Sequence, residues 1–293
     1  MIPRLLFSPA EPRFRAGWRL LFQFVLMFGT VIVLTVPVIF VHLLGVSFPV
    51  ELLVNQLAIF VAINLSVPLA RRFLDKRSFV SLGLNLRGAL PDLIAGLVIA
   101  GAIMGAIFAA ELWLGWATIE GVAWQTQNRL EVVIELAIWL GIFVIGGWQE
   151  ELLARGYWLQ NIAEGTNLPI GVLASSALFG LMHIGNPGAS WIAIAGLFLA
   201  GLFLACGYLL TKQLWLPIGL HIGWNFFEGN VFGFQVSGLD TFRLVHLNVN
   251  GPELWTGGSF GPEAGLIVIP AMVLGVVLMW GYVRVMHDRQ QRI

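Results

Sequence analysis

Three groups of polar residues could do chemistry within an otherwise apolar chain. They are Glu150-Glu151-x-x-x-Arg155, Phe179-x-x-x-His183 and His221-x-x-x-Asn225, and each lies inside or at the edge of a hydrophobic run. An ionisable side chain next to lipid costs roughly 2.5 to 3.5 kcal/mol on insertion scales, so such residues usually mark a working site inside a helical bundle. A carboxylate, two imidazoles and an amide suit the hydrolysis of a carbonyl compound by water.

Two chemical routes are open to these side chains. In the first, Glu150 takes a proton from water, His183 orients that water, and His221 with Asn225 donates hydrogen bonds to the tetrahedral oxyanion. In the second, His183 and His221 bind a divalent metal such as zinc with a Glu as third ligand, which leaves a water in an open position. The residue types do not separate the two routes.

The composition places this chemistry in a membrane. The chain has 293 residues, of which 58% are hydrophobic and 11% are charged, and its mean hydropathy is +0.85. These values exclude a water-soluble domain and are typical of a polytopic membrane protein. Cys206 is the only cysteine, which excludes an intramolecular disulfide and a thiol metal cluster. The sequence has no nucleic-acid-binding signature.

The elements expected to position the polar groups are membrane helices. A span needs about 20 mostly apolar residues, and the hydrophobic runs predict an all-α bundle of about eight spans, at residues 20–44, 52–70, 93–110, 132–147, 168–184, 191–210, 214–227 and 266–283. The fourth, fifth and seventh are short, and they carry the polar groups. Short, polar-interrupted spans are where a bundle usually holds its site.

The positive charges predict the orientation of the bundle. With eight spans, 14 of the 16 Lys and Arg residues fall on one side, which should be the cytoplasmic side together with both termini. We expect a single integral-membrane domain over residues 1–293 with a motif-bearing core at about 131–230. A Gly- and Pro-rich loop at about 228–262 should lie outside the cytoplasm, either folded back over the bundle or as a plain surface loop.

Helical spacing predicts how the polar side chains are presented. Glu151 and Arg155 stand four residues apart and can pair, while Glu150 is rotated by about 100° and can face a cavity. The alternative for this motif is a solvated helix end.

Phe179 and His183 share one helix face, as do His221 and Asn225. The alternative for each histidine is a hydrogen-bonded core residue. Glu150 and His183 are equidistant from the turn at 165–167, so an antiparallel hairpin of helices would place them level. The helix lengths do not by themselves bring His221 to the same level.

Other intramembrane protease chemistries do not fit the sequence. It contains no His-Glu-x-x-His helix of the zincin type, no Gly-x-Ser-x-Gly elbow and no pair of Asp residues within the expected spans. The candidate acid is therefore a Glu.

The three motifs, in this order, resemble those of the CPBP family, the bacterial relatives of the type II CAAX prenyl endopeptidases, which is also called the Abi family. The resemblance covers Trp148 to about Phe227; the first three expected spans are similar to the family only in hydropathy. It implies an intramembrane endopeptidase with Glu150 as base, His183 as its helper, and His221 and Asn225 as the oxyanion site. Glu151, Arg155 and Phe179 would support these residues.

The same resemblance implies a place and a class of substrate. The protein would lie in the bacterial cytoplasmic (inner) membrane, in contact with membrane lipid, and act on a membrane-associated peptide or protein rather than on nucleic acid. The family is commonly labelled metallopeptidase, yet a metal-free glutamate mechanism is also argued for it, so the metal stays open. A prenylated CAAX substrate is not implied for bacterial relatives.

A noncatalytic alternative also fits the chain. A membrane scaffold or a bacteriocin self-immunity factor could use the same bundle to bind a partner. A transporter is disfavoured, because the polar residues cluster on one set of helices.

Overall fold

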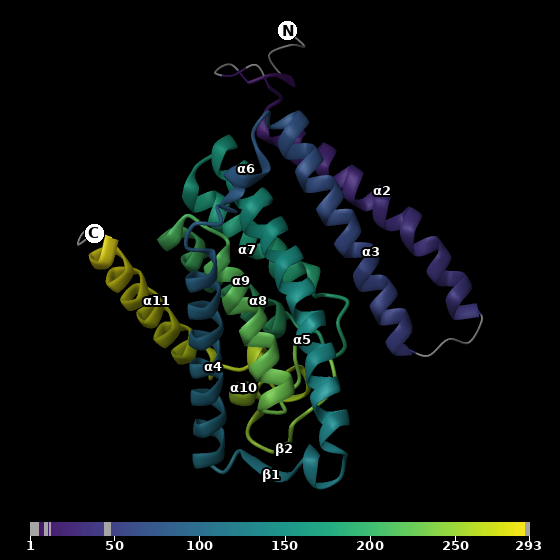
Figure 1. Ribbon diagram of the computed structural model, residues 1–293, viewed down its shortest axis with the longest axis vertical. Helices are drawn as coiled ribbons and strands as arrows, with labels where there is room; N and C mark the ends of the chain where they lie inside the picture. The colour runs from purple at the N-terminus through teal and green to yellow at the C-terminus, as the bar shows by residue number, and fades with distance from the viewer. Residues whose placement is uncertain (1–5, 9–10, 12, 44–47, 291–293) are drawn as a thin grey trace. The chain divides into compact units, whose positions relative to one another are not determined.

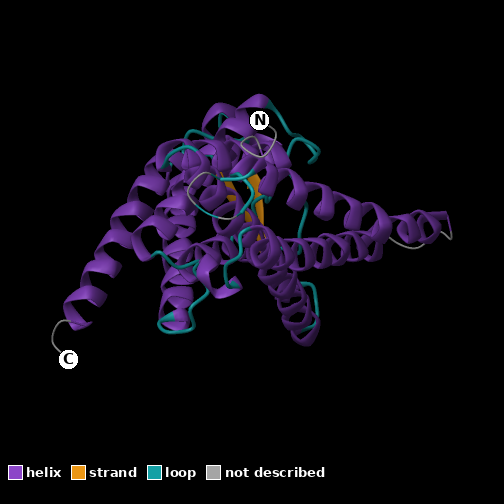
Figure 2. Ribbon diagram, turned by 90° about the horizontal axis from the view of Figure 1, so that it is seen from above, coloured by secondary structure: helices purple, strands orange, loops and turns teal. Residues whose placement is uncertain are grey.

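Helices form nearly all of the structure. The computed structural model describes residues 6–8, 11, 13–43 and 48–290, and side chains over 6–8, 11, 13–36 and 55–286. Figure 2 shows one small sheet beside the helices. Contacts divide the described residues into two units, one within Met1–Asn85 and Trp148–Ser175, the other within Leu86–Gly147 and Ser176–Ile293.

The first unit is built on two long apolar helices that pack along each other (Figure 1). Its elements are α2 (Ala16–Leu43), α3 (Phe48–Leu69), the π-helix η1 (Ala70–Leu74), the 3-10 helix η2 (Phe79–Leu82), the π-helix η4 (Leu152–Trp158), α6 (Leu159–Gly165) and the start of α7 (Leu168–Met182). Helix α5 (Arg129–Glu151) continues directly into η4 and α6, which gives one helical run of 37 residues. The fourth span, expected to be short at 132–147, is therefore part of a much longer helical run.

A buried polar network holds this helical run in the first unit. The carboxylate of Asp75 is fully buried and pairs with Arg19 at 3.2 Å and with Arg71 at 2.9 Å. Tyr157 and Asn161 each donate a hydrogen bond to the same carboxylate, both at 3.3 Å. Because buried charges are costly unless they are paired and hydrogen-bonded, this network fixes η4 and α6 against α2 and η1.

The second unit contains the remaining helices and the sheet. Its elements are α4 (Ala89–Trp113), β1 (Ala117–Val122), η3 (Ala123–Gln125), most of α5, the end of α7 (Leu168–Met182), α8 (Trp191–Thr211), α9 (Trp215–Asn225), the π-helix η5 (Phe226–Val231), β2 (Val245–Val249), α10 (Glu253–Thr256), η6 (Gly258–Phe260), η7 (Pro262–Ala264) and α11 (Val268–Gln290). The strands pair antiparallel, from Ala117 opposite Val249 to Val122 opposite Val245, with an irregularity between Ile119 and Gly121.

Two glycines let helix α9 approach α4 at backbone distance. A Cβ added to Gly219 would lie 2.2 Å from the carbonyl oxygen of Leu93, and one added to Gly223 would lie 3.0 Å from the Cα of Leu97. Small residues four apart are the usual means of close helix packing in membranes. They place α9, and the polar side chains that it carries, firmly on α4.

The long loop before α11 folds back onto the second unit. Its apolar side chains Phe234, Val236 and Phe260 are buried, and strand β2 pairs with β1. Gly196 of α8 lies so close to the loop that an added Cβ would be 1.8 Å from the carbonyl oxygen of Glu263. The prediction of a folded-back loop is confirmed, and the alternative of a plain surface loop is wrong.

The prediction of an all-α polytopic membrane bundle is confirmed. Six described helical segments are long and apolar enough to cross a membrane, at Ala16–Val36, Asn55–Leu74, Ala89–Trp113, Arg129–Gly165, Trp191–Thr211 and Val268–Met286. The other two expected spans are the 15-residue helix α7 and the 11-residue helix α9. The count of eight spans is therefore not confirmed, and the orientation stays a prediction.

Candidate functional site

The Glu-Glu-x-x-x-Arg motif lies where α5 passes into the π-helix η4. Arg155 Nη1 donates to Glu151 Oε1 at 2.5 Å, and the two side chains are 1% and 0% exposed. This confirms the predicted pair, and the alternative of a solvated helix end is wrong. Glu150 is partly buried and lies near enough for its charge to act on the guanidinium of Arg155.

Hydrogen bonds from neighbouring aromatic and amide side chains hold this motif within the first unit. Trp148 Nε1 donates to Asn64 at 2.9 Å, and Gln149 Nε2 donates to Gln56 at 3.1 Å. Trp158 Nε1 donates to Gln23 of α2 at 3.3 Å. Donors on both sides of the Glu pair are thus tied to α2 and α3, which limits the rotation of the helix that presents Glu150.

His183 and His221, both in the second unit, contact one phenylalanine. Phe179 is 3% exposed, and its ring centroid lies 5.2 Å from that of His183 and 5.8 Å from that of His221. The contact with His221 joins two motifs that are separate in the sequence. Phe179 is therefore the residue around which the structure gathers both imidazoles.

His183 lies just outside the helix on which we expected it. Helix α7 ends at Met182, and His183 begins a turn in which the Asn186 N–H donates to its carbonyl at 3.0 Å. The predicted fifth span, 168–184, is thus too long by two residues. His183 Nδ1 lies 2.9 Å from the carbonyl oxygen of Phe179, a hydrogen bond that orients the ring.

His221 and Asn225 lie on one face of α9, as their spacing predicts. His221 is 6% exposed, and Asn225 is half-buried. The Asn225 amide makes no hydrogen bond with the described residues. Asn225 ends α9, and the π-helix η5 begins at the next residue.

Two buried carboxylates of the second unit were not predicted from the sequence. Glu228 is fully buried in η5, and Glu263 is 4% exposed in η7. Burial and the neighbouring charge of Glu263 raise the pKa of Glu228 well above its usual value. Burial also raises the pKa of Glu263, while hydrogen bonds from Ser237 and the charges of His183 and His221 oppose that rise. Glu263 is thus an electrostatic neighbour of both histidines.

Hydrogen bonds connect Glu263 to the His183 turn. The Asn186 side chain donates to the Ser237 carbonyl at 2.9 Å, and the Ser237 hydroxyl donates to Glu263 Oε2 at 2.5 Å. The folded-back loop therefore carries an acidic group to the histidines. Glu228, three residues past Asn225, could have been inferred from helical spacing. Glu263 had no such signal, because only the folding of the loop brings it there.

The predicted residues divide between the two units. Glu150, Glu151 and Arg155 belong to the first, and Phe179, His183, His221 and Asn225 belong to the second. The convergence of Glu150 with the two histidines stays a prediction. Within the part of the chain that the structure describes, no three His, Cys, Asp or Glu side chains form a group that could hold a metal ion.

Comparison with models of known protein families gives a match within this chain. Residues 132–227 match the family model of the type II CAAX prenyl endopeptidases, Rce1-like. This segment is about a third of the 293 residues and contains all seven residues of the three motifs. Neither the curated proteins nor the solved structures gave a match.

Proposed function

We propose that this protein is an intramembrane endopeptidase that cleaves membrane-associated peptides or proteins by activating water. Its residues 132–227 match the Rce1-like model of the type II CAAX prenyl endopeptidase family. The observation that best supports this proposal is the contact of both histidines with Phe179, because it joins two of the family's motifs in one place. The ion pair between Glu151 and Arg155, two residues of the remaining motif, adds to this support.

In the proposed reaction Glu150 is the base. It accepts a proton from water while the water oxygen forms a bond to the scissile carbonyl carbon, and the carbonyl electron pair moves onto oxygen. The buried Glu151–Arg155 ion pair fixes the helical turn that presents the Glu150 carboxylate. His183, oriented by its bond to the Phe179 carbonyl, would hold the water.

His221 and Asn225 would stabilise the tetrahedral intermediate. Both can donate hydrogen bonds from one face of α9, and donors aimed at a developing oxyanion are worth about 3 kcal/mol each in comparable sites. The intermediate collapses when the carbon–nitrogen bond breaks and the proton held by Glu150 passes to the leaving amine.

The metal route stays an alternative proposal. A catalytic zinc usually has three protein ligands, and the described residues contain no such group. A bound metal would polarise the scissile carbonyl and activate the water, with His183 and His221 among its ligands. The mechanism above does not require it.

A Glu150→Gln variant tests the proposal. The variant keeps the shape of the side chain but cannot accept the proton, so we expect cleavage to fall by about 10²- to 10⁴-fold while membrane insertion is unchanged. Labelling of free amino groups in membranes that contain the parent protein would detect new peptide termini and so identify the cleaved proteins directly. Rates on such a substrate would then be measured with purified protein.

The matched control is Glu111→Gln. Glu111 is also a buried glutamate in a membrane helix, and neither of its carboxylate oxygens has a hydrogen-bond partner among the described residues. It lies outside the three motifs, so this variant should keep full activity. Identical sets of termini from the parent and the Glu150→Gln variant would reject Glu150 as the base. If His183 and His221 can be replaced without effect as well, the scaffold or immunity factor is favoured. A stoichiometric transition metal that is lost in His183→Ala would instead establish the metal route.

A further inference from the structure

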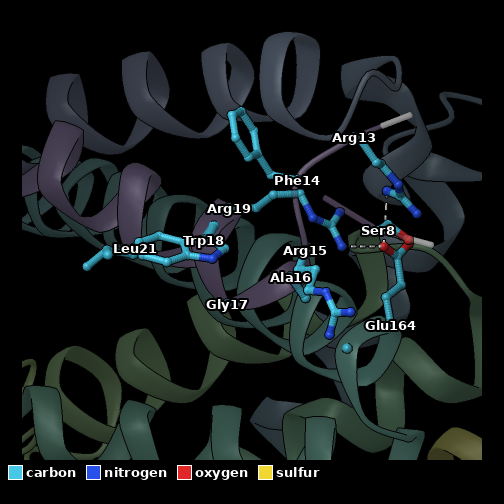
Figure 3. Close-up of a pocket in the computed structure, with 11 residues that line it drawn as sticks. Ser8, Arg13, Phe14, Arg15, Ala16, Gly17, Trp18, Arg19, Leu21 and Glu164 are labelled. Carbon is cyan, nitrogen blue, oxygen red and sulfur yellow. Dashed lines mark hydrogen bonds and ion pairs between the residues drawn. The ribbon is translucent and has the colours of Figure 1, made fainter. Parts of the chain in front are cut away.

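A cavity in the first unit lies at the N-terminal end of α2. Its wall contains none of the motif residues Glu150, Glu151 and Arg155. Its volume is about 590 Å³, and its walls include Arg13, Phe14, Arg15, Trp18, Arg19 and Glu164. Figure 3 shows the guanidinium groups of Arg13 and Arg19 directed toward the carboxylate of Glu164. None of these side chains has a role in the proposed peptidase reaction.

Positive charge exceeds negative charge around this cavity. Glu164 is shared by Arg13 at 3.2 Å, by Arg19 at 3.0 Å and by Arg77, while Asp75 is shared by Arg19 and Arg71. Glu11 pairs with Arg13 and Arg77. Arg15 donates only to a backbone carbonyl, that of Phe7, and pairs with no described carboxylate. These five arginines and three carboxylates leave positive charge in excess, and three of the arginines but only one carboxylate, Glu164, line the cavity.

The buried arginine Arg19 has an unused donor beside the cavity. Its side chain is 3% exposed, yet its Nε has no hydrogen-bond partner among the described residues. A buried donor without a partner costs about 1 to 3 kcal/mol. A negatively charged ligand in the cavity would lower that cost.

The start of α2 adds a second source of positive potential. The helix has no acidic residue in its first turn, so the positive end of its dipole is not compensated from within the helix. Gly17 is exposed, and a Cβ added there would meet no atom within 4 Å. In this first turn the Trp18 and Arg19 N–H groups donate to the Arg15 carbonyl, whereas those of Ala16 and Gly17 have no backbone acceptor among the described residues, as at many phosphate-binding helix termini.

The surroundings of the cavity favour a lipid as the source of the anion. Trp18, Leu21 and Phe22 are all exposed at the start of the first membrane span, and the rings of Trp18 and Phe22 stack at a centroid distance of 6.0 Å. Exposed tryptophan at the end of a span marks the level of the lipid headgroups. An anion bound at this level, next to exposed apolar side chains of α2, would be the phosphate of a phospholipid whose acyl chains lie along the helix.

We propose that this cavity binds the phosphate of an anionic phospholipid headgroup, held by Arg15, Arg19 and the first turn of α2. Guanidinium groups match the oxygens of a phosphate geometrically, and charge-assisted hydrogen bonds to it are about twice as strong as neutral ones. The bound lipid would anchor the N-terminal end of α2 to the charged network that also holds η4.

Thermal unfolding of the purified full-length chain in a neutral detergent tests this site. Three additives are compared: phosphatidylglycerol, a diacylglycerol with the same acyl chains but no phosphate, and soluble glycerol 3-phosphate. We expect phosphatidylglycerol alone to raise the melting temperature. An equal effect of diacylglycerol would overturn the phosphate site, and an equal effect of glycerol 3-phosphate would overturn the assignment to a lipid.

Two variants and one control link the effect to the cavity. Arg15→Gln removes one charged hydrogen-bond donor to the phosphate. The apparent affinity for phosphatidylglycerol should therefore weaken about tenfold, which corresponds to about 1.4 kcal/mol. Gly17→Glu fits the open space and suits a helix start, so the protein should stay folded but lose the phosphatidylglycerol effect. Arg72→Gln, at an exposed arginine outside the cavity, should respond like the parent. An unchanged response in both Arg15→Gln and Gly17→Glu would overturn the proposal.

Discussion

At the scale of single residues, local spacing predicts one kind of contact well and misses another. The Glu151–Arg155 pair follows from helix geometry, because side chains four residues apart face each other. The proximity of Glu228 and Glu263 does not follow from spacing, because only the folding of the loop brings these two carboxylates close together. Like charges that are buried together favour protonation, so this pair makes the stability of the fold sensitive to pH.

The Glu228→Gln variant should show this sensitivity. The pKa of Glu228 is raised in the folded protein above the usual value of 4.5. A group of this kind contributes stability that is fully present below its unfolded pKa and is lost as the pH rises through its folded pKa. We therefore expect the melting temperature of the parent, measured from about pH 4 to about pH 8, to fall relative to that of the variant as the pH rises.

The control for this measurement is Glu253→Gln, because Glu253 is exposed in the same loop. Its pH dependence should match that of the parent. Parallel pH curves for the parent and Glu228→Gln would contradict the proposed origin of the effect.

At the scale of elements, π-helices directly follow two of the motifs, and a closely packed glycine lies on the helix that carries His221 and Asn225. The π-helix η4 begins directly after Glu151, and the π-helix η5 begins directly after Asn225. Single turns of π-helix are rare and are often found at functional sites. The apolar runs of the sequence predict the helices but not these changes of helical type, since both depend on how the buried side chains pack.

A Gly219→Ala variant tests the packing that positions α9. Its new methyl group would meet the carbonyl of Leu93 at 2.2 Å, so α9 must shift away from α4. Overpacking of this kind costs about 1 to 3 kcal/mol, and we expect a lower melting temperature and reduced cleavage. Gly141→Ala is the matched control, because a Cβ at Gly141 meets nothing within 4 Å; alanine there should leave the protein as stable or slightly more so. Equal melting temperatures for the two variants would contradict the tight α4–α9 contact.

At the scale of the whole molecule, composition and charge predict membrane insertion and its direction. The helices confirm an integral membrane protein. Its orientation stays a prediction, which depends on 14 of 16 positive residues lying on one side when eight spans are counted. The exposed residues Arg72 and Glu253 should therefore lie on opposite sides of the membrane.

Cysteine labelling checks this orientation. In a Cys206→Ala background, which removes the only native thiol, we expect Glu253→Cys to react with a membrane-impermeant maleimide in intact cells. Arg72→Cys should react only after the cells are opened. The reverse pattern would show that the termini lie outside the cytoplasm, and labelling of both in intact cells would contradict the number of spans assumed between them.

The amino-acid sequence by itself determined the membrane environment, the helical architecture and the side chains that share a helix face. These properties depend on composition and on the fixed geometry of a helix, which relates only residues a few positions apart. The tertiary structure alone decided that His183 and His221 meet at Phe179, that Glu263 lies near them, and that Glu164 joins the N-terminal arginines at one cavity. Such contacts join residues far apart in the chain, so they depend on glycine-mediated helix packing and on a loop that no short-range spacing can specify.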